Sequence, residues 1–397
     1  MGPLKISWKS LRSKPLSSGL NILLISFGVG ILTILLLAST QITEKLENNS
    51  KDIDLVVGAK GSPLQLILSS IYYIDFPTGN IPLKEAMELA HSPFVKRAVP
   101  LALGDNYNGA RIVGTDSNFV SVYHLKTSQG KIWDNDFEVT IGAAIAKNQN
   151  LKLGDSFNGA HGLTGNSDLH EAHPYKVVGI LENQGNVTDN LIFTNVASVW
   201  EMHEEENGKH KEPHNENDKE LTSLLIQYRS PMSVVMFPQM VNQTTNMQAA
   251  SPAQESTRLF SLIGVGVDTL KWFAVLIMLI AAISVFVNLY NSLKERQYDL
   301  AIMRTLGASR GKLFLIIITE GLILSLTGAL LGIAVGHLTL ELISTYQDST
   351  QAKLTGLVFL IDEIYLLAAG LAIGIFASVL PALQAYKADI SKILSKN

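Results

Sequence analysis

Four long apolar stretches without a charged residue constrain this chain more than any other feature. A helix needs about 20 apolar residues to cross the roughly 30 Å hydrocarbon core of a bilayer, and each stretch reaches that length. They are residues 15–43, 272–293, 321–340 with an apolar lead-in from 313, and 364–386. The sequence therefore predicts an α-helical membrane protein with four transmembrane helices.

Composition agrees with a membrane protein and excludes several other classes. The 397 residues are 47% hydrophobic with a mean hydropathy of +0.22, which exceeds what a soluble core of this size needs. The net charge of −4 gives no reason to expect a nucleic-acid partner. The chain has no cysteine, which excludes disulfides, thiolate metal sites and cysteine nucleophiles.

The first stretch has a second interpretation as a signal peptide, because Lys5, Lys9, Arg12 and Lys14 form a basic region before it. Its uncharged run is longer than the 7–15 residues of a typical apolar signal region. We therefore expect a retained transmembrane helix.

The distribution of Lys and Arg predicts the orientation. Residues 1–14, 294–312 and 387–397 carry 12 basic and 3 acidic residues, whereas 44–271 and 341–363 carry 19 and 31. Because cytoplasmic loops are enriched in Lys and Arg, both termini are expected in the cytoplasm. The expected segments are 1–14 (cytoplasmic), 15–43 (helix 1), 44–260 (extracytoplasmic domain), 261–293 (leading into helix 2), 294–312 (cytoplasmic coupling segment), 313–340 (helix 3), 341–363 (extracytoplasmic loop), 364–386 (helix 4) and 387–397 (cytoplasmic tail).

The large insert between helices 1 and 2 is long enough for its own core, and its patterns predict an α+β extracytoplasmic domain. Residues 201–220, rich in acidic residues, are expected to be a solvated loop, and 256–268 are expected to begin a long helix. The apolar segment 62–74 is either a groove that meets a lipophilic substrate or a buried helix. Strands are expected at 54–58, 110–114, 137–142, 175–181, 191–193 and 224–228, and helices at 83–90 and 143–151.

The segment 293–309, LKERQYDLAIMRTLGAS, resembles the cytoplasmic motif of the FtsX-like permease superfamily of ABC transporters, with a MacB-like periplasmic core domain in the insert. The C-terminal segment PALQAYKADISKIL is also similar to the family's ending, although Ala388-Asp389 replaces its usual proline-containing step. Supporting similarities in the insert are VGTDSNF at 113–119, Ile141-Gly142 and LKLGD at 151–155.

The resemblance implies a multi-pass permease of the bacterial inner membrane that pairs with a second copy or a close paralogue. Two copies of a separate ATPase subunit would bind ATP and Mg²⁺, and their hydrolysis would move the periplasmic domain to export, release or extract a substrate. Membrane lipids, and a periplasmic adaptor or a substrate-binding protein, are further expected partners. The alternatives are a signalling subunit that activates a periplasmic enzyme, and a permease for zinc or another divalent metal.

The residues themselves indicate a chain without catalysis of its own. No G-x-x-x-x-G-K-[ST] phosphate-binding loop occurs, nor any H-E-x-x-H motif. The segment 295–305 predicts a short amphipathic helix that ends at Gly307, and its position between two spans suggests the ATPase contact. The expected coupling residues are Glu295, Arg296, Asp299, Leu300, Met303, Arg304, Leu306 and Gly307, with Ile302 as a further apolar contact.

Two features of spans three and four predict close helix packing. Small residues recur at four-residue spacing, which lets helices approach closely within one subunit or across a dimer. Glu320 needs a partner inside the membrane, and we expect an interhelical hydrogen bond in preference to a proton relay. The small residues are Gly328, Gly332 and Gly336, then Gly370, Gly374 and Ser378.

Histidines cluster in the insert, and imidazoles with carboxylates can hold a Zn²⁺-like ion without thiolates. Against this, Pro213 disfavours a helix that would align His210 with His214, and polar loops collect histidine by composition alone. A zinc site therefore remains an alternative to a solvated loop. The candidate ligands are His161, His170, His173, His203, His210 and His214.

Overall fold

The computed structural model describes residues 2–161, 173–206, 219–346 and 354–387. The chain divides into two compact units, a helical unit (1–42, 263–348 and 353–397) and an inserted domain (43–262 with 349–352). The boundaries at 42/43 and 262/263 fall inside the two long helices α2 (Pro15–Ser50) and α9 (Pro252–Glu295), so each helix continues from one unit into the other.

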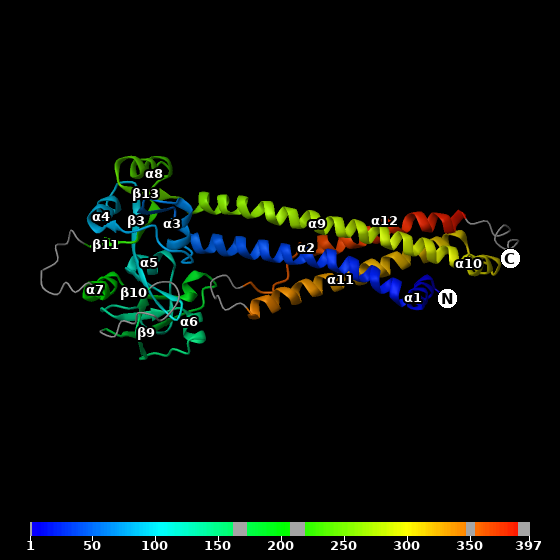
Figure 1. The fold of residues 1–397 in the computed structure, drawn as a ribbon, viewed down its shortest axis with the longest axis horizontal. Coiled ribbons are helices and arrows are strands. Elements are labelled where there is room, and N and C mark those ends of the chain that lie inside the picture. The colour runs from blue at the N-terminus through cyan, green and yellow to red at the C-terminus, as the bar shows by residue number, and fades with distance from the viewer. Residues whose placement is uncertain (1, 162–172, 207–218, 347–353, 388–397) are drawn as a thin grey trace. The chain divides into compact units, whose positions relative to one another are not determined.

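The helical unit holds four helices that are long and apolar enough to cross a membrane, as the uncharged stretches predict. They are α2, α9, α11 (Arg310–Tyr346) and α12 (Glu363–Lys387), and they lie side by side in Figure 1. Two shorter helices, α1 (Pro3–Ser13) and α10 (Gln297–Thr305), complete the unit. Helix α2 begins at Pro15 immediately after α1 ends, because proline suits a first helical position where no N–H donor is needed.

The glycine ridges of α11 and α12 lie at contacts within this chain. A Cβ atom at Gly332 would lie 2.7 Å from the backbone oxygen of Ser26 on α2, and one at Gly370 would lie 2.8 Å from Cβ of Ala329 on α11. Gly328 and Gly336 also face α2, and Gly374 faces α11. Packing within one subunit therefore accounts for both ridges, since small residues permit close helix contact in lipid.

A buried polar cluster fastens the chain between α11 and α12. The two ring nitrogens of His337 lie 2.6 Å from the backbone oxygen of Gly356 and 3.1 Å from Oε2 of Glu363. Its ring also stacks on Phe359.

Two further side chains bind the same segment. Glu341 accepts hydrogen bonds from Thr355 Oγ1 and the Gly356 N–H. Gln41 of α2 forms hydrogen bonds with both the backbone N–H and the backbone oxygen of Thr355. Three helices thus hold this loop.

The inserted domain is α+β, as predicted, and is built on a mixed sheet with the order β13-β1-β12-β3-β4-β10-β6-β9-β5. Strands β7 and β8 pair with β9 and β3, and a separate small sheet joins β11 and β2. The strands are β1 (Leu55–Ala59), β2 (Ile81–Pro82), β3 (Val95–Tyr107), β4 (Ala110–Thr115), β5 (Thr127–Gly130), β6 (Glu138–Ile141), β7 (Ser156–Phe157), β8 (Ala160–His161), β9 (Tyr175–Leu181), β10 (Leu191–Asn195), β11 (Glu220–Leu221), β12 (Ser223–Tyr228) and β13 (Met247–Ala250).

Both faces of the central part of this sheet are covered, which explains the apolar runs in β1, β10 and β12. Successive side chains alternate between faces, so Leu55 and Val57 of β1 pack with α4 and α8, whereas Val56 packs with α3 and α5. The helices of the domain are α3 (Pro63–Ser70), α4 (Leu83–Ala90), α5 (Ser117–Val122), α6 (Ala143–Asn148), α7 (Val196–Glu206) and α8 (Ser233–Thr244), with a 3-10 turn at Val187–Asn190.

The apolar segment 62–74 is a helix followed by a buried turn. Ser62 caps α3 by accepting the Gln65 N–H, and Leu66, Ile67 and Tyr73 are fully enclosed. The buried-helix interpretation of this segment is therefore correct. The expectation of a loop from 201 was wrong at its start, because α7 extends through Glu206. Likewise, the long helix begins at Pro252, four residues before the expected position.

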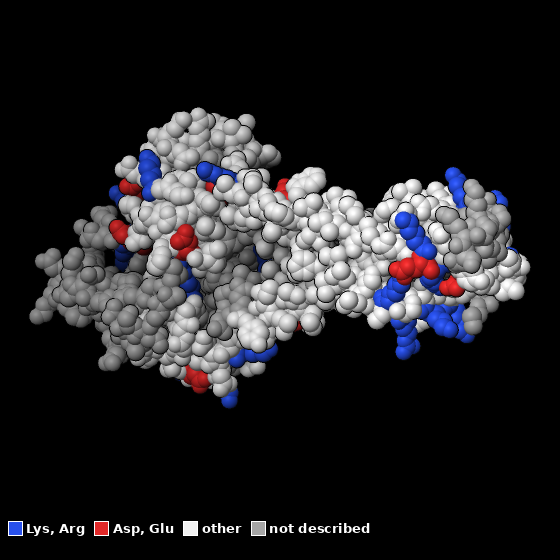
Figure 2. Space-filling model, turned by 45° about the vertical axis from the view of Figure 1, so that its right-hand side comes forward, with Lys and Arg blue, Asp and Glu red and all other residues white. Residues whose placement is uncertain are grey.

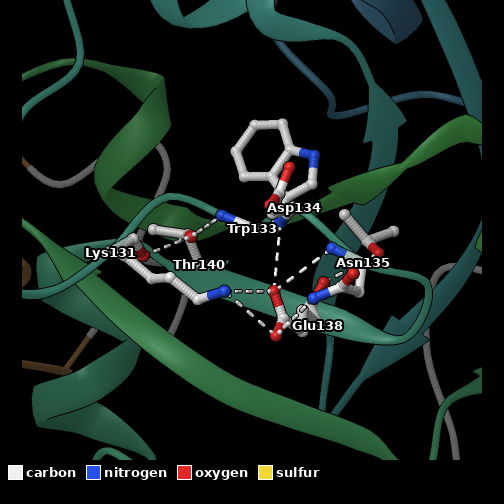
Figure 3. Close-up of polar contacts among 7 residues, drawn as sticks. Lys131, Trp133, Asp134, Asn135, Glu138 and Thr140 are labelled. Atoms are coloured by element: carbon white, nitrogen blue, oxygen red, sulfur yellow. Dashed lines mark hydrogen bonds and ion pairs between the residues drawn. The ribbon is translucent and has the colours of Figure 1, made fainter.

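A tight polar turn before β6 orders the part of the domain that contains Trp133 (Figure 3). The carboxylate of Glu138 accepts hydrogen bonds from Lys131 Nζ, from the backbone N–H groups of Asp134 and Asn135, and from the Asn135 side chain. Burial opposes ionisation of Glu138, but these donors outweigh it and lower the pKa of Glu138 to about 2. The Trp133 ring stacks on Phe193 in the core.

Candidate coupling site

Helix α10 forms the connection between α9 and α11, and the sequence around it explains its sharp ends. Leu306 is the C-cap residue of α10. Gly307 follows with φ +94°, a left-handed backbone conformation that favours glycine. The Ala308 N–H bonds back to the oxygen of Met303 at 2.9 Å. Ser309 then accepts the Lys312 N–H at 3.2 Å and starts α11. The Leu-Gly-Ala-Ser motif is thus a helix stop followed by a helix start.

One face of α10 is fixed on the helical unit and the other is open. Leu300 is only 6% exposed and Ala301 2%, and both pack on the helical unit. Leu306 is 82% exposed, and Tyr298 and Ile302 are also exposed. The apolar residues that we expected to contact the ATPase therefore fall into a buried group and an exposed group. Leu300 lies in the chain's own core, Met303 is half-buried against it, and the open apolar surface consists of Tyr298, Ile302 and Leu306.

Arg296, at the N-terminal cap of α10, joins three helices. Its Nη1 donates to Oγ of Ser10 on α1 and lies 3.3 Å from Oε1 of Glu320 on α11. Glu320 is 1% exposed, and a buried carboxylate needs such a partner because an unpaired charge in the membrane is expensive. Beside this contact, Lys14 pairs with Glu295. The sequence predicts that Glu320 is buried, because it lies in an apolar span. No sequence pattern predicts that Ser10 and Lys14 lie nearby.

The remaining expected coupling residues lie at the ends of α10. Asp299 is exposed in the first turn and Arg304 is in the last turn, positions where their charges suit the helix dipole. Within the part of the chain that the structure describes, the buried Nε atom of Arg304 has no hydrogen-bond partner.

Most Lys and Arg side chains that the structure describes in the helical unit belong to α1, to α10 or to the residues directly beside them. Figure 2 shows Lys and Arg with a few acidic residues at this end, followed by a wide zone without charge. Lys294 also lies 4.6 Å above the ring of Tyr290. The basic residues of these segments are Lys5, Lys9, Arg12, Lys14, Lys294, Arg296, Arg304, Arg310 and Lys312.

The histidines of the inserted domain do not form a described metal site. His170, His210 and His214 lie outside the described residues. His161 is in β8 and His203 is in α7, and His173 stacks on Phe137 at 4.8 Å. Among the described residues, no three His, Asp or Glu side chains are placed to hold a metal. The zinc site stays a prediction.

Comparison with known proteins agrees with this layout. The MacB-like periplasmic core domain model matches residues 18–244, which is more than half of the chain, and the FtsX-like permease C-terminal model matches 272–390. The chain belongs to the FtsX/MacB-type family of ABC transporter permeases. This permease family implies an ABC ATPase as partner, and together with the apolar helices it indicates the bacterial inner membrane.

One curated relative of this permease is the lipoprotein-releasing system transmembrane protein LolE of Haemophilus influenzae. The two are 30% identical over 138 residues, which is 31% of this chain and 33% of LolE, so the match spans about a third of the relative. The periplasmic region of MacB from Actinobacillus actinomycetemcomitans is 12% identical, covering 54% of this chain and 97% of that structure, with a TM-score of 0.34. The extracellular domain of YknZ from Gram-positive bacteria is 14% identical, covering 50% and 99%, with a TM-score of 0.31.

Proposed function

We propose that this permease converts ATP hydrolysis by a separate ATPase subunit into movements of its periplasmic domain, and so exports, releases or extracts a substrate on the periplasmic side. Both termini and α10 face the cytoplasm, as the excess of Lys and Arg around them supports. Two ATPase copies and a second permease copy complete the transporter, with a periplasmic adaptor or substrate-binding protein as an additional partner.

The observation that carries this proposal is the divided surface of α10. Its inner side is fixed by Leu300, Ala301 and the Arg296 contact with Glu320, so a force on the helix passes to α11. Its outer side presents Ile302 and Leu306 to a partner. Exposed apolar side chains next to charged groups are typical of the centre of a protein interface.

The route onward from α10 runs along α9. Helix α9 ends at Glu295, one residue before Arg296, and continues without a break into the inserted domain. A continuous helix holds its rise of about 1.5 Å per residue through internal hydrogen bonds. Displacement of α10 can therefore be delivered to the inserted domain through the backbone of this one helix, without a polar path through the membrane.

The test is the double variant Ile302→Asp/Leu306→Asp, reconstituted with the ATPase subunit. We expect stimulated ATP hydrolysis to fall to the rate of the ATPase alone, because hot-spot residues cost about 2 kcal/mol or more each when lost. Insertion and the unfolding midpoint should be unchanged, since both side chains are exposed. Full stimulation by this variant would contradict the assignment.

Two comparisons separate loss of docking from loss of folding. Val235→Asp places the same charge on an exposed apolar position of α8 in the inserted domain and should leave stimulation intact. Leu300→Asp should instead lower the unfolding midpoint, because it buries a carboxylate in the helical core.

A further inference from the structure

Helix α1 has one face that is held firmly against the rest of the helical unit. Ser7 Oγ donates to the backbone oxygen of Ile316 at 2.9 Å, and Ser10 Oγ accepts a hydrogen bond from Arg296. Ser7 and Ser10 are buried, and Ile6 and Leu11 pack on the same core. These contacts fix the rotation of α1 about its axis, and therefore determine which side chains point outward.

The outward face carries two adjacent stripes of different chemistry. Leu4 and Trp8, four residues apart, are 69% and 58% exposed. At about 100° per residue, Arg12, Lys5 and Lys9 follow next around the helix, and all three are exposed. An apolar stripe thus lies directly beside a basic one.

Among the residues that the structure describes, no acidic side chain pairs with the basic stripe. Residues 1–43 include no Asp or Glu. Within the described ranges, Lys14 pairs with Glu295, but no ion pair is formed by Lys5, Lys9 or Arg12. Three cations therefore stand next to exposed Leu and Trp side chains, and none of them forms an ion pair with a described residue.

We propose that this face of α1 binds anionic phospholipid headgroups. A transmembrane helix begins at Pro15, two residues after α1 ends, so α1 lies where the hydrocarbon meets the headgroups. Trp and Leu enter the boundary of the acyl region, and Lys and Arg extend to the phosphates. The excess of three positive charges selects anionic over zwitterionic lipid. This binding does not depend on the proposed coupling function.

Fluorescence quenching of Trp8 tests the proposal on the full chain. The chain has four tryptophans, of which Trp133 and Trp200 belong to the inserted domain, so Trp272→Phe leaves Trp8 as the one in the helical unit. This variant is reconstituted in phosphatidylcholine vesicles with a low mole fraction of brominated phosphatidylglycerol or of brominated phosphatidylcholine. We expect phosphatidylglycerol to associate at least about tenfold more strongly, since each basic side chain near an anionic surface contributes roughly fivefold.

Charge variants separate a defined site from general attraction. Replacing Lys5, Lys9 and Arg12 by Gln should abolish the preference for phosphatidylglycerol, as should high salt. Replacing Lys84, Lys96 and Lys152 by Gln removes the same charge from exposed positions of the inserted domain and should leave the preference unchanged. Equal quenching by the two lipids would overturn the proposal, and so would an absence of quenching, which would mean that protein covers α1. The two-lipid comparison decides the question even if the triple variant does not fold.

Discussion

Oε1 of Glu320, a residue of the third turn of α11, lies 3.3 Å from Nη1 of Arg296 at the start of α10. Only 1% of Glu320 is exposed. The same Nη1 of Arg296 also donates a hydrogen bond to Oγ of Ser10 on α1. One guanidinium therefore links α10 to two other helices of the helical unit. The ion pair makes the position of α10 dependent on α11, which is the property that the proposed coupling requires.

Removal of Arg296 should be more harmful than removal of both charges. Arg296→Met leaves Glu320 buried without its ion-pair partner, and we expect a loss of about 3 kcal/mol in stability. Adding Glu320→Gln should recover most of this loss, and Glu320→Gln alone should have a modest effect. Thermal unfolding in detergent measures the three variants, with the exposed Arg310→Met as control. A double variant no more stable than Arg296→Met would show that the ion pair is not the cause.

Gly332 should not tolerate a methyl group. Its Cβ would lie 2.7 Å from the oxygen of Ser26 and 2.8 Å from Cβ of Val29, so Gly332→Ala should cost about 1–3 kcal/mol through forced separation of α2 and α11. Gly311→Ala on the same helix has open space around it and should be neutral or slightly stabilising. Equal unfolding midpoints for the two variants would rule out the close contact.

Glu138 should make the stability of the inserted domain depend on pH under acidic conditions. Its folded pKa of about 2 lies below the ordinary value of 4.5. The ionised side chain therefore contributes fully above about pH 4.5, and the contribution is lost as pH falls towards 2. Glu138→Gln should remove this part of the pH dependence, as followed by the fluorescence of buried Trp133. The exposed Glu88→Gln serves as control, and an unchanged acid transition in Glu138→Gln would contradict the role of the turn.

His337 should control the order of the loop between α11 and α12. His337→Ala removes the contacts to Gly356, Glu363 and Phe359. The amides of Thr355, Gly356 and Leu360, which now donate to side chains of the helices, should exchange faster with deuterium. His91→Ala provides the comparison, because the His91 ring bonds to the backbone oxygen of Met87 in the adjacent α4 and lies in the inserted domain. Unaltered exchange in the loop would mean that Gln41 and Glu341 suffice to hold it.

Much of the fold follows from local sequence, but its longest strand does not. The four apolar stretches predict four long helices because length and hydropathy suffice for that inference. Strand β3 escaped prediction because Pro100 and Gly104 interrupt its apolar pattern, and proline normally argues against a central strand. Pro100 nevertheless lies opposite Leu224 in the sheet. Helix α8 was missed for a similar reason, since Pro238 stands inside it.

The candidate site was predictable in position but not in detail. The motif at 293–309 places a short helix between two spans, and its glycine indicates where the helix ends. Periodicity cannot show which side of α10 packs inward, because Leu300 and Ile302 are equally apolar and only the fold buries the first. The contact of Arg296 with Ser10 joins residues 286 positions apart, and no local pattern encodes such a pair.

The most direct test of coupling is a distance measurement between the two units in the presence of the ATPase. The chain has no cysteine, so Lys84→Cys on α4 and Ile361→Cys in the loop before α12, both exposed, can carry spin labels without further substitution. Double electron–electron resonance should show a distance distribution that changes between the nucleotide-free complex and the complex trapped with ATP and vanadate. The change should disappear in the Ile302→Asp/Leu306→Asp background. An identical distribution in both states, while the ATPase hydrolyses ATP at the stimulated rate, would contradict the account.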